Sequence, residues 1–150
     1  MGITIANRQR LLKINRIRLH RNADYWLDFL SSSENQMSLV FIRDNKMQIL
    51  NSQYREIHET TDVLAFPDFY RIKPNKISNN FAENTFLGDI VISTDEVLRL
   101  SIEESKELDE LIDELFLHGI LHLHDYDHQN KKESLRMKRI ERKLFSNRPN

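Results

Sequence analysis

The sequence predicts an α+β fold in which helices pack on a small mixed β-sheet. Patterns typical of strands and of amphipathic helices alternate in the order strand, helix, strand, helix, and two strands and then helices follow. The length of 150 residues suits one hydrophobic core. Because no internal repeat or composition shift marks a boundary, residues 1–150 are expected to form a single domain.

The first part of the chain predicts a strand, a helix and a second strand. Residues 2–6 alternate apolar and polar positions, which is the spacing of a half-buried strand. Residues 16–30 place apolar side chains at helical intervals, and three consecutive serines predict the end of this helix. Residues 37–42, with the sequence MSLVFI, predict the second strand because β-branched and aromatic side chains favour pleated, buried positions.

The middle of the chain predicts a helix and two further strands around a long loop. Asp44 is expected to cap a helix at its N-terminus, and that helix carries Met47, Leu50 and Tyr54. Residues 61–66 (TDVLAF) predict a strand that Pro67 ends. Residues 68–85 show no sustained period and predict a loop, whereas residues 87–93 (LGDIVIS) predict another strand.

Three helices complete the prediction. Ser93 or Thr94 can cap the first, which is expected to run to about Ile102. The second, residues 107–123, has the strongest pattern, and the last, residues 133–145, is amphipathic. The residues expected on or near one stripe of the second helix are Leu108, Leu111, Ile112, Leu115, Leu121 and His122.

The composition excludes several kinds of protein. The chain has no cysteine, so a disulfide framework and a thiolate metal site are both excluded. It has no apolar run long enough for a membrane-spanning helix or a secretory signal. We therefore expect a cytoplasmic protein without a membrane partner.

Charge is unevenly distributed although the net charge is only −1. Arginines and lysines gather near both ends of the chain, and residues 95–114 are acidic. The simpler interpretation is that the cations are solvated helix faces, and the alternative is that they form a phosphate-binding patch. Nothing in the sequence indicates a specificity for DNA.

Four of the six histidines lie within eleven residues, in the segment HGILHLHDYDH. His118 and His122 are one helical turn apart and can converge on one ion. His128 can join them only if the helix stops after about His124 and the chain turns back, and Asp125 stands where that turn is needed. Three imidazoles leave one position of tetrahedral zinc open, which is typical of a catalytic site.

The histidine spacing also matches that of the metzincin proteases, H-E-x-x-H-x-x-G-x-x-H. The sequence therefore predicts a zincin-like metal-binding helix. A zinc peptidase, however, requires a glutamate directly after the first histidine as its general base, and Gly119 occupies that position. Peptidase activity is accordingly a weak hypothesis.

Three blocks of the sequence resemble the YbeY family of metal-dependent endoribonucleases. The segment from His118 to His128 resembles the family signature H-G-x-L-H-L-x-G-Y-D-H. The segment Tyr54-Arg55 followed by TDVLAFP resembles Y-R followed by T-D-V-L-S-F-P, and LGDI at 87–90 resembles the family's L-G-D-I. The chain departs from the family pattern at two positions. Asp125 replaces a glycine that is expected to end the helix in a left-handed conformation, which Asp tolerates at some cost. Ala65 replaces a serine.

The resemblance implies a zinc-dependent endoribonuclease that cleaves single-stranded RNA. Its implied partners are ribosomal RNA and the small ribosomal subunit, and its implied roles are maturation of that RNA and ribosome quality control. In the expected mechanism a metal-activated water or a metal-polarised phosphate reacts at the three-histidine site, and Arg55 stabilises the developing charge. The alternative is a non-catalytic ribosome-assembly factor whose metal only stabilises the fold.

The remaining candidate residues are predicted to support the site. Asp127 is a candidate to orient a ligand imidazole, and Asp62 and Asp89 lie beside the matched blocks. His124 is not expected to be a ligand, although it can support the site. Three cations of the last helix, Lys132, Arg136 and Arg139, are candidates for RNA contacts. Imidazole ligands also suit nickel, cobalt and copper, so the sequence does not select zinc over them.

Overall fold

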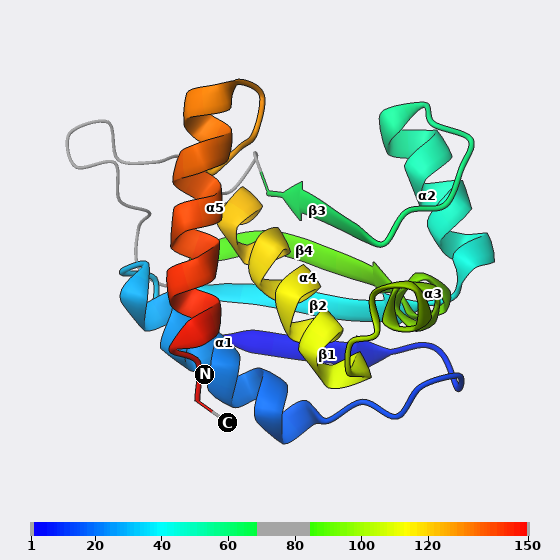
Figure 1. Cartoon of the computed structure of the whole chain (residues 1–150), viewed down its shortest axis with the longest axis horizontal. Helices are drawn as coiled ribbons and strands as arrows, with labels where there is room; N and C mark the ends of the chain where they lie inside the picture. Colours follow the sequence, from blue (N-terminus) through cyan, green and yellow to red (C-terminus); the bar gives the residue numbers. More distant parts are fainter. Residues whose placement is uncertain (1, 69–84, 150) are drawn as a thin grey trace.

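A computed structural model describes residues 2–68 and 85–149 of the chain. Within those ranges one four-stranded sheet has five helices around it (Figure 1). The strand order is β1-β2-β4-β3. The prediction of an α+β fold with a small mixed sheet is therefore confirmed. The predicted loop at 68–85 lies, apart from its two end residues, outside the described residues.

The sheet combines parallel and antiparallel pairs. The strands are β1 (Ile3–Asn7), β2 (Gln36–Ile42), β3 (Val63–Pro67) and β4 (Phe86–Ser93). β2 pairs in parallel with both β1 and β4, whereas β3 runs antiparallel to β4 at the edge of the sheet. The edge position explains why Pro67 is tolerated in β3, because an edge strand can lack one donor for the ladder.

Helices cover the sheet unequally. They are α1 (Arg16–Phe29), α2 (Asp44–Arg55), α3 (Thr94–Glu104), α4 (Leu108–Leu123) and α5 (Lys131–Ser146). Figure 1 shows α4 crossing the sheet with α1 and α5 beside it, while α2 and α3 lie toward one end. None of the described helices is long and apolar enough to cross a membrane.

Buried side chains form one hydrophobic cluster on each face of the sheet. The larger cluster joins the sheet to α1, α4 and α5, and Trp26 of α1 packs edge-on against Phe116 of α4. The indole N–H of Trp26 donates to the carbonyl of Leu144 in α5. The smaller cluster joins Met47 of α2 to Leu64 and Val91 on the other face. α4 is thus held between two helices and the sheet.

Burial surrounds most of α4. Between residues 111 and 123, only Glu114, His118 and His122 are not fully buried. These residues are spaced by four, so they form a single stripe, and buried residues, Asp113 among them, occupy the rest of the circumference. At 100° per residue His122 projects between Leu111 and Leu115, on the expected stripe. The helix packs on several further sides, which the predicted stripe did not include.

Asp44 is the first residue of α2 and does not cap it. Arg43 holds the cap position without a side-chain hydrogen bond. The Asp44 carboxylate instead accepts hydrogen bonds from Thr60, Ser93 and Arg99. Ser93, one of the two predicted caps of α3, also accepts from the backbone N–H of Glu96. Asp44 thereby ties α2 to the start of α3 and to the segment that leads into β3.

Candidate metal centre

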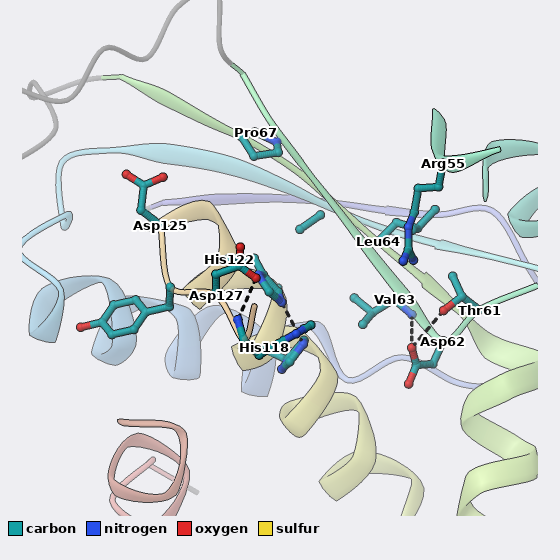
Figure 2. A pocket seen from close by; sticks show the side chains of 14 residues that line it. Arg55, Thr61, Asp62, Val63, Leu64, Pro67, His118, His122, Asp125 and Asp127 are labelled. Carbon is teal, nitrogen blue, oxygen red and sulfur yellow. Dashed lines mark hydrogen bonds between the residues drawn. The ribbon is translucent and has the colours of Figure 1, made fainter. Parts of the chain in front are cut away.

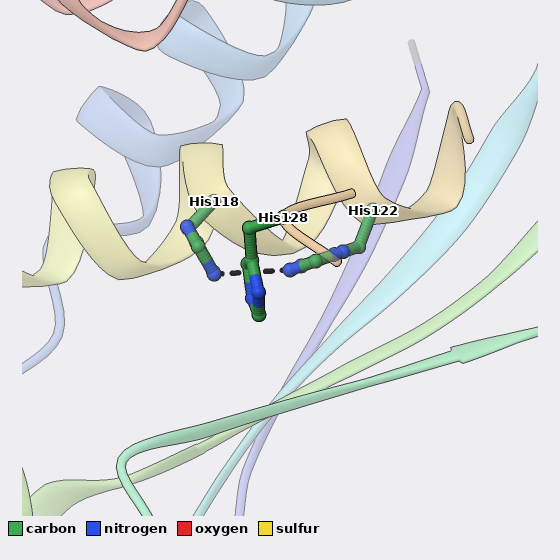
Figure 3. Close-up of side chains that lie close together, drawn as sticks. All are labelled: His118, His122 and His128. Carbon is green, nitrogen blue, oxygen red and sulfur yellow. Dashed lines mark hydrogen bonds between the residues drawn. The ribbon is translucent and has the colours of Figure 1, made fainter. Parts of the chain in front are cut away.

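His118 and His122 project from the half-buried stripe of α4 toward one point. Their Nε2 atoms lie 3.0 Å apart, close enough to share one ion (Figure 3). The surrounding helix is otherwise buried, which limits the movement of its backbone. Two of the predicted ligands are thus placed by the helical repeat alone.

A left-handed turn brings the third histidine back. α4 ends at Leu123, and Asp125 has a φ of 65°. The N–H of Asp125 donates to His122 and the N–H of Tyr126 donates to Leu121, which is the hydrogen-bond pattern of a Schellman motif. The predicted helix end is confirmed, and Asp adopts the left-handed conformation that the resemblance implied.

The three imidazoles form a compact group. One nitrogen from each of His118, His122 and His128 lies within 4.8 Å of the others. Tetrahedral zinc with Zn–N bonds of about 2.05 Å needs ligand nitrogens about 3.3 Å apart. The separation of 3.0 Å between His118 and His122 is close to that requirement. His128 is the exposed member of the group and completes a donor set that could hold one metal ion.

Two imidazoles have a polar neighbour away from the point that they share. The Nδ1 atom of His118 lies 3.4 Å from a carboxylate oxygen of Glu141 in α5. The backbone of Tyr126 lies beside the His122 ring. Burial, and then the neighbouring His118 and His128, lower the pKa of His122 and so favour its neutral, metal-binding form. Each ring can therefore keep Nε2 directed inward.

Glu141 is the site residue that the sequence analysis missed. One signal could have identified it, because Glu141 follows Met137 by four residues and precedes Leu144 by three. Met137 and Leu144 are both buried, so the carboxylate borders the inner face of α5. An acidic side chain at such a position usually has a partner on the neighbouring element.

The histidines open into a pocket of about 510 Å³. β3 and the segment before it form the opposite wall, and Arg55 reaches toward the pocket from the end of α2 (Figure 2). Arg55 is distant in sequence from the histidines, but the structure brings them together as the resemblance implied. Ala65, where the family has serine, also lines the pocket.

The end of α2 fixes the position of Arg55. Glu56 follows it in a left-handed conformation with a φ of 57°. The side chain of Asn51 donates to the carbonyl of Glu59, and Ser52 is hydrogen-bonded to His58. These contacts hold the chain between α2 and β3 against the helix, so the exposed Arg55 projects from a fixed backbone.

Two of the predicted supporting carboxylates line the pocket. Asp62 accepts a hydrogen bond from the N–H of Val63 at 2.7 Å and lies just before β3 (Figure 2). Asp127 accepts from the N–H of His128 at 2.7 Å, which fixes the backbone that carries the third ligand.

Two other predicted supporting residues lie elsewhere. Asp89 lies on the face of β4 opposite Ile90, in a groove with Tyr54 and Phe66, and it accepts a hydrogen bond from Ser38. The His124 ring donates through Nδ1 to the carbonyl of Ile120 and is hydrogen-bonded to Ser32 through Nε2. Burial lowers the pKa of His124. Neither residue lines the three-histidine pocket.

The three predicted RNA-binding cations also lie outside the pocket lining. Lys132, Arg136 and Arg139 are exposed and share one face of α5. At 100° per residue this face is roughly opposite Glu141, the residue of α5 that contacts His118. Arg136 lies 4.8 Å above the ring centre of Tyr126, which itself lines the pocket.

Gly119 allows α4 to approach the sheet closely. A Cβ atom at this position would lie 2.7 Å from Cγ2 of Ile90 in β4. Any side chain there would point at the sheet and collide with it. The structure therefore leaves no room for the glutamate that a zinc peptidase carries at this position.

Comparisons with known proteins find one family. A family model described as Endoribonuclease YbeY matches residues 4–148. A Thermodesulfovibrio yellowstonii protein named Endoribonuclease YbeY is 28% identical over 162 residues, covering 98% of this chain and 97% of the relative. A Rhizobium leguminosarum relative of the same name is 36% identical over 111 residues, covering 74% of this chain and 61% of the relative. A Bartonella henselae relative, again of that name, is 33% identical and covers 77% and 70%.

A solved structure supports the fold independently. The solution structure of a Thermotoga maritima protein matches with a TM-score of 0.62 and 22% sequence identity. The match covers 96% of this chain and 87% of that protein. At this identity the likeness concerns the arrangement of helices and strands.

Proposed function

Because the chain belongs to the Endoribonuclease YbeY family, we propose that it is a metal-dependent endoribonuclease that cleaves single-stranded RNA. The observation that carries the proposal is the convergence of three imidazoles in a pocket that also receives an arginine. We further propose that the substrate is RNA of the small ribosomal subunit, cleaved during its maturation and quality control. Residues 1–150 would act as one cytoplasmic enzyme domain.

His118, His122 and His128 would hold the metal ion, for which zinc is our first candidate. Such an ion would supply Lewis acidity, either lowering the pKa of a water or polarising a phosphoryl oxygen. The three rings are neutral donors, so the site keeps the full positive charge of its ion for the anionic phosphodiester. Other divalent transition metals also accept imidazole ligands.

Arg55 would bind the phosphodiester from the other side of the pocket. Its guanidinium is always charged and planar, so it can donate two parallel hydrogen bonds to phosphate oxygens. As negative charge grows on those oxygens in the transition state, the interaction strengthens. Asp62 and Asp127 line the same pocket and would orient water or substrate hydroxyl groups.

The basic face of α5 would hold RNA beyond the cleavage site. Lys132, Arg136 and Arg139 are exposed along this face, and Arg136 contacts a residue of the pocket lining. Lysine and arginine attract phosphates without regard to base identity. These contacts would therefore add affinity and leave the choice of cleavage site to the pocket.

A cleavage assay on labelled single-stranded RNA tests the proposal. It compares chelator-treated protein, the same protein after metal is restored, and the His122→Ala variant. We expect cleavage to disappear with the chelator, to return with metal and to be absent in the variant, because each treatment removes the ion or a ligand.

The other outcomes are equally informative. A folded, metal-loaded protein that binds RNA without cutting it would replace the proposal with a non-catalytic ribosome-assembly factor. Equal cleavage in all three samples would indicate a contaminating nuclease. It would also contradict the proposed role of the three-histidine site in cleavage.

A further inference from the structure

Glu141 of α5 lies behind the metal centre. Its Oε1 atom is 3.4 Å from Nδ1 of His118, and both side chains are about one-third exposed, at 30% and 31%. The two residues are on different helices, which pack side by side (Figure 1). The contact is therefore tertiary and depends on how α5 docks against α4.

The contact is on the outer nitrogen of the ring. Nε2 of His118 faces His122, whereas Nδ1 points to the opposite side (Figure 3). Glu141 does not line the three-histidine pocket. Its carboxylate is thus placed to act on His118 and not on a substrate in the pocket.

A carboxylate at this position selects one form of the imidazole. A neutral imidazole carries its proton on Nδ1 or on Nε2, and an ionised carboxylate only accepts hydrogen bonds. Glu141 therefore favours the tautomer with the proton on Nδ1, which leaves the Nε2 lone pair available to an ion. The negative charge also makes that lone pair a stronger donor.

The second predicted ligand on α4 has a different kind of neighbour. The backbone of Tyr126 lies beside His122. The turn at the end of α4 places Tyr126, whereas the neighbour of His118 is supplied by α5. Glu141 is a side chain, so substitution can remove it while the backbone remains.

We propose that Glu141 is the positioning residue of the metal centre, which orients His118 and fixes its tautomer. The inference rests on the proposed function in that it requires a metal ion at the three histidines. This role makes α5 part of the site, because the helix that carries the basic face also carries Glu141, the residue that orients His118.

Metal affinity of the full-length protein measures this role directly. Competition between the protein and a chromogenic chelator for Zn²⁺ gives the dissociation constant for the wild type, Glu141→Gln and Glu141→Ala. Loss of an outer carboxylate typically weakens metal binding about 10- to 100-fold, and we expect a loss in that range for both variants. The matched control is Glu133→Gln, which makes the same chemical change at an exposed position near the start of α5 and should bind as the wild type does.

The tautomer of His118 provides a second readout that a purely structural role would not move. Long-range ¹H–¹⁵N correlation spectra of the metal-free protein report the populations of the two His118 tautomers, and the Nδ1-protonated fraction should be higher in the wild type than in Glu141→Gln. In Glu141→Gln the Nε2-protonated form should gain population while the thermal midpoint of the metal-free protein stays the same.

The outcomes separate this inference from the proposed function. If the wild type binds Zn²⁺, His122→Ala abolishes binding and both Glu141 variants bind as tightly as the wild type, Glu141 has no positioning role although the metal centre stands. If the wild type fails to bind Zn²⁺, the metal centre and the role of Glu141 are overturned together.

Discussion

The backbone conformation of Asp125 decides whether a third imidazole reaches the candidate metal centre. Its φ of 65° reverses the chain after α4, and its N–H closes the turn on His122. Residues with a Cβ adopt this conformation at a cost, which is lowest for Asn and Asp and highest for β-branched side chains. A single position thus connects the end of a helix to the assembly of the ligand set.

Replacing Asp125 with valine should damage both stability and metal binding. We expect the free energy of unfolding to fall by about 1–2 kcal/mol, because a β-branched side chain is strained in the left-handed region. Displacement of His128 should also weaken Zn²⁺ binding. Urea unfolding and chelator competition measure the two effects, and Asp125→Gly, which removes the strain, is the control. Wild-type behaviour of the valine variant would show that the turn does not set the position of His128.

We expect Arg55, which lines the pocket, to contribute to the chemistry alone. Replacing it with alanine is expected to reduce RNA cleavage by about 10²- to 10³-fold, because the charge that forms on the phosphate loses its fixed donor. Metal content should remain that of the wild type, since the three histidines are unchanged. Cleavage rates and elemental analysis of the purified protein test both statements.

An exposed arginine outside the pocket provides the comparison for Arg55. Arg10→Ala removes the same charge from another surface and should leave cleavage nearly unchanged. If Arg55→Ala retained cleavage at the level of Arg10→Ala, Arg55 would have no part in the mechanism.

Contacts between helices and strands form the two walls of the pocket. α4 supplies the histidine wall and lies close to the sheet because residue 119 is glycine. The opposite wall begins at the end of α2 and continues into β3, and the Asp44 carboxylate anchors it through Thr60, Ser93 and Arg99. Arg43 adds a two-point contact with Asp95 at the start of α3. The position of Arg55 therefore depends on polar contacts between elements.

The Asp44 contacts predict a pH-dependent contribution to stability. Burial would raise the pKa of Asp44, but the hydrogen bonds from Ser93, Arg99 and Thr60 together lower it below the ordinary value of 3.8. Because the pKa is lower in the folded state, the stabilisation is complete well above pH 4 and is lost as the pH falls below 3.8 toward the folded-state value. Replacement of Asp44 with asparagine should remove about 2 kcal/mol at pH 7.

Urea unfolding between pH 3 and pH 7 tests this linkage. The difference in stability between the wild type and Asp44→Asn should narrow as the pH falls below 4, since the wild-type carboxylate becomes protonated. Asp24→Asn changes an exposed aspartate of α1 and serves as the control. A difference between wild type and Asp44→Asn that stays constant over the whole range would contradict the ionic role of Asp44.

The molecule as a whole combines a neutral balance of charge with a local concentration of cations. Its net charge is −1, yet α5, which borders the candidate metal centre through Glu141, carries several exposed lysines and arginines on its other faces. A nuclease needs such a local field because the substrate is a polyanion, while the acidic residues elsewhere limit nonspecific attraction. The affinity for RNA should consequently depend on salt.

Salt dependence measures the contribution of the α5 cations. Each phosphate neutralised on a single strand adds about −0.7 to the slope of the logarithm of the binding constant against the logarithm of salt concentration. Changing Lys132, Arg136 and Arg139 together to alanine should flatten that slope by about 2 if all three contact phosphates. Titrations at several salt concentrations, with a non-cleavable RNA, give the slopes.

A charge-conserving variant is the control for this measurement. Lys132→Arg combined with Arg136→Lys and Arg139→Lys retains all three charges and should retain the slope. An unchanged slope in the alanine variant would mean that RNA binds to another surface. A wild-type binding constant that does not change with salt concentration would exclude electrostatic binding by α5.

The sequence alone determined the local features of this protein. Periodicity located the four strands and five helices of residues 2–68 and 85–149 to within a few residues, because side-chain spacing directly reflects the 2-residue and 3.6-residue repeats. It also predicted the convergence of His118, His122 and His128, since two lie on consecutive turns and the third follows a helix end with a recognisable turn residue. The resemblance of three short blocks to a family then indicated that Arg55 belongs to the same site.

The tertiary structure decided which distant residues accompany those histidines. Periodicity did not indicate that α4 is buried on nearly every side. It also did not indicate that the Asp44 carboxylate accepts hydrogen bonds from other elements, such as the one from Arg99 in α3, or that Glu141 contacts His118. Asp89 and His124 are close in sequence to residues of the site, yet Asp89 faces the other side of the sheet and His124 faces Ser32. Local repeats set the direction of a side chain relative to its own helix or strand. Which neighbour it meets depends on packing between elements, and that packing is a property of the whole chain.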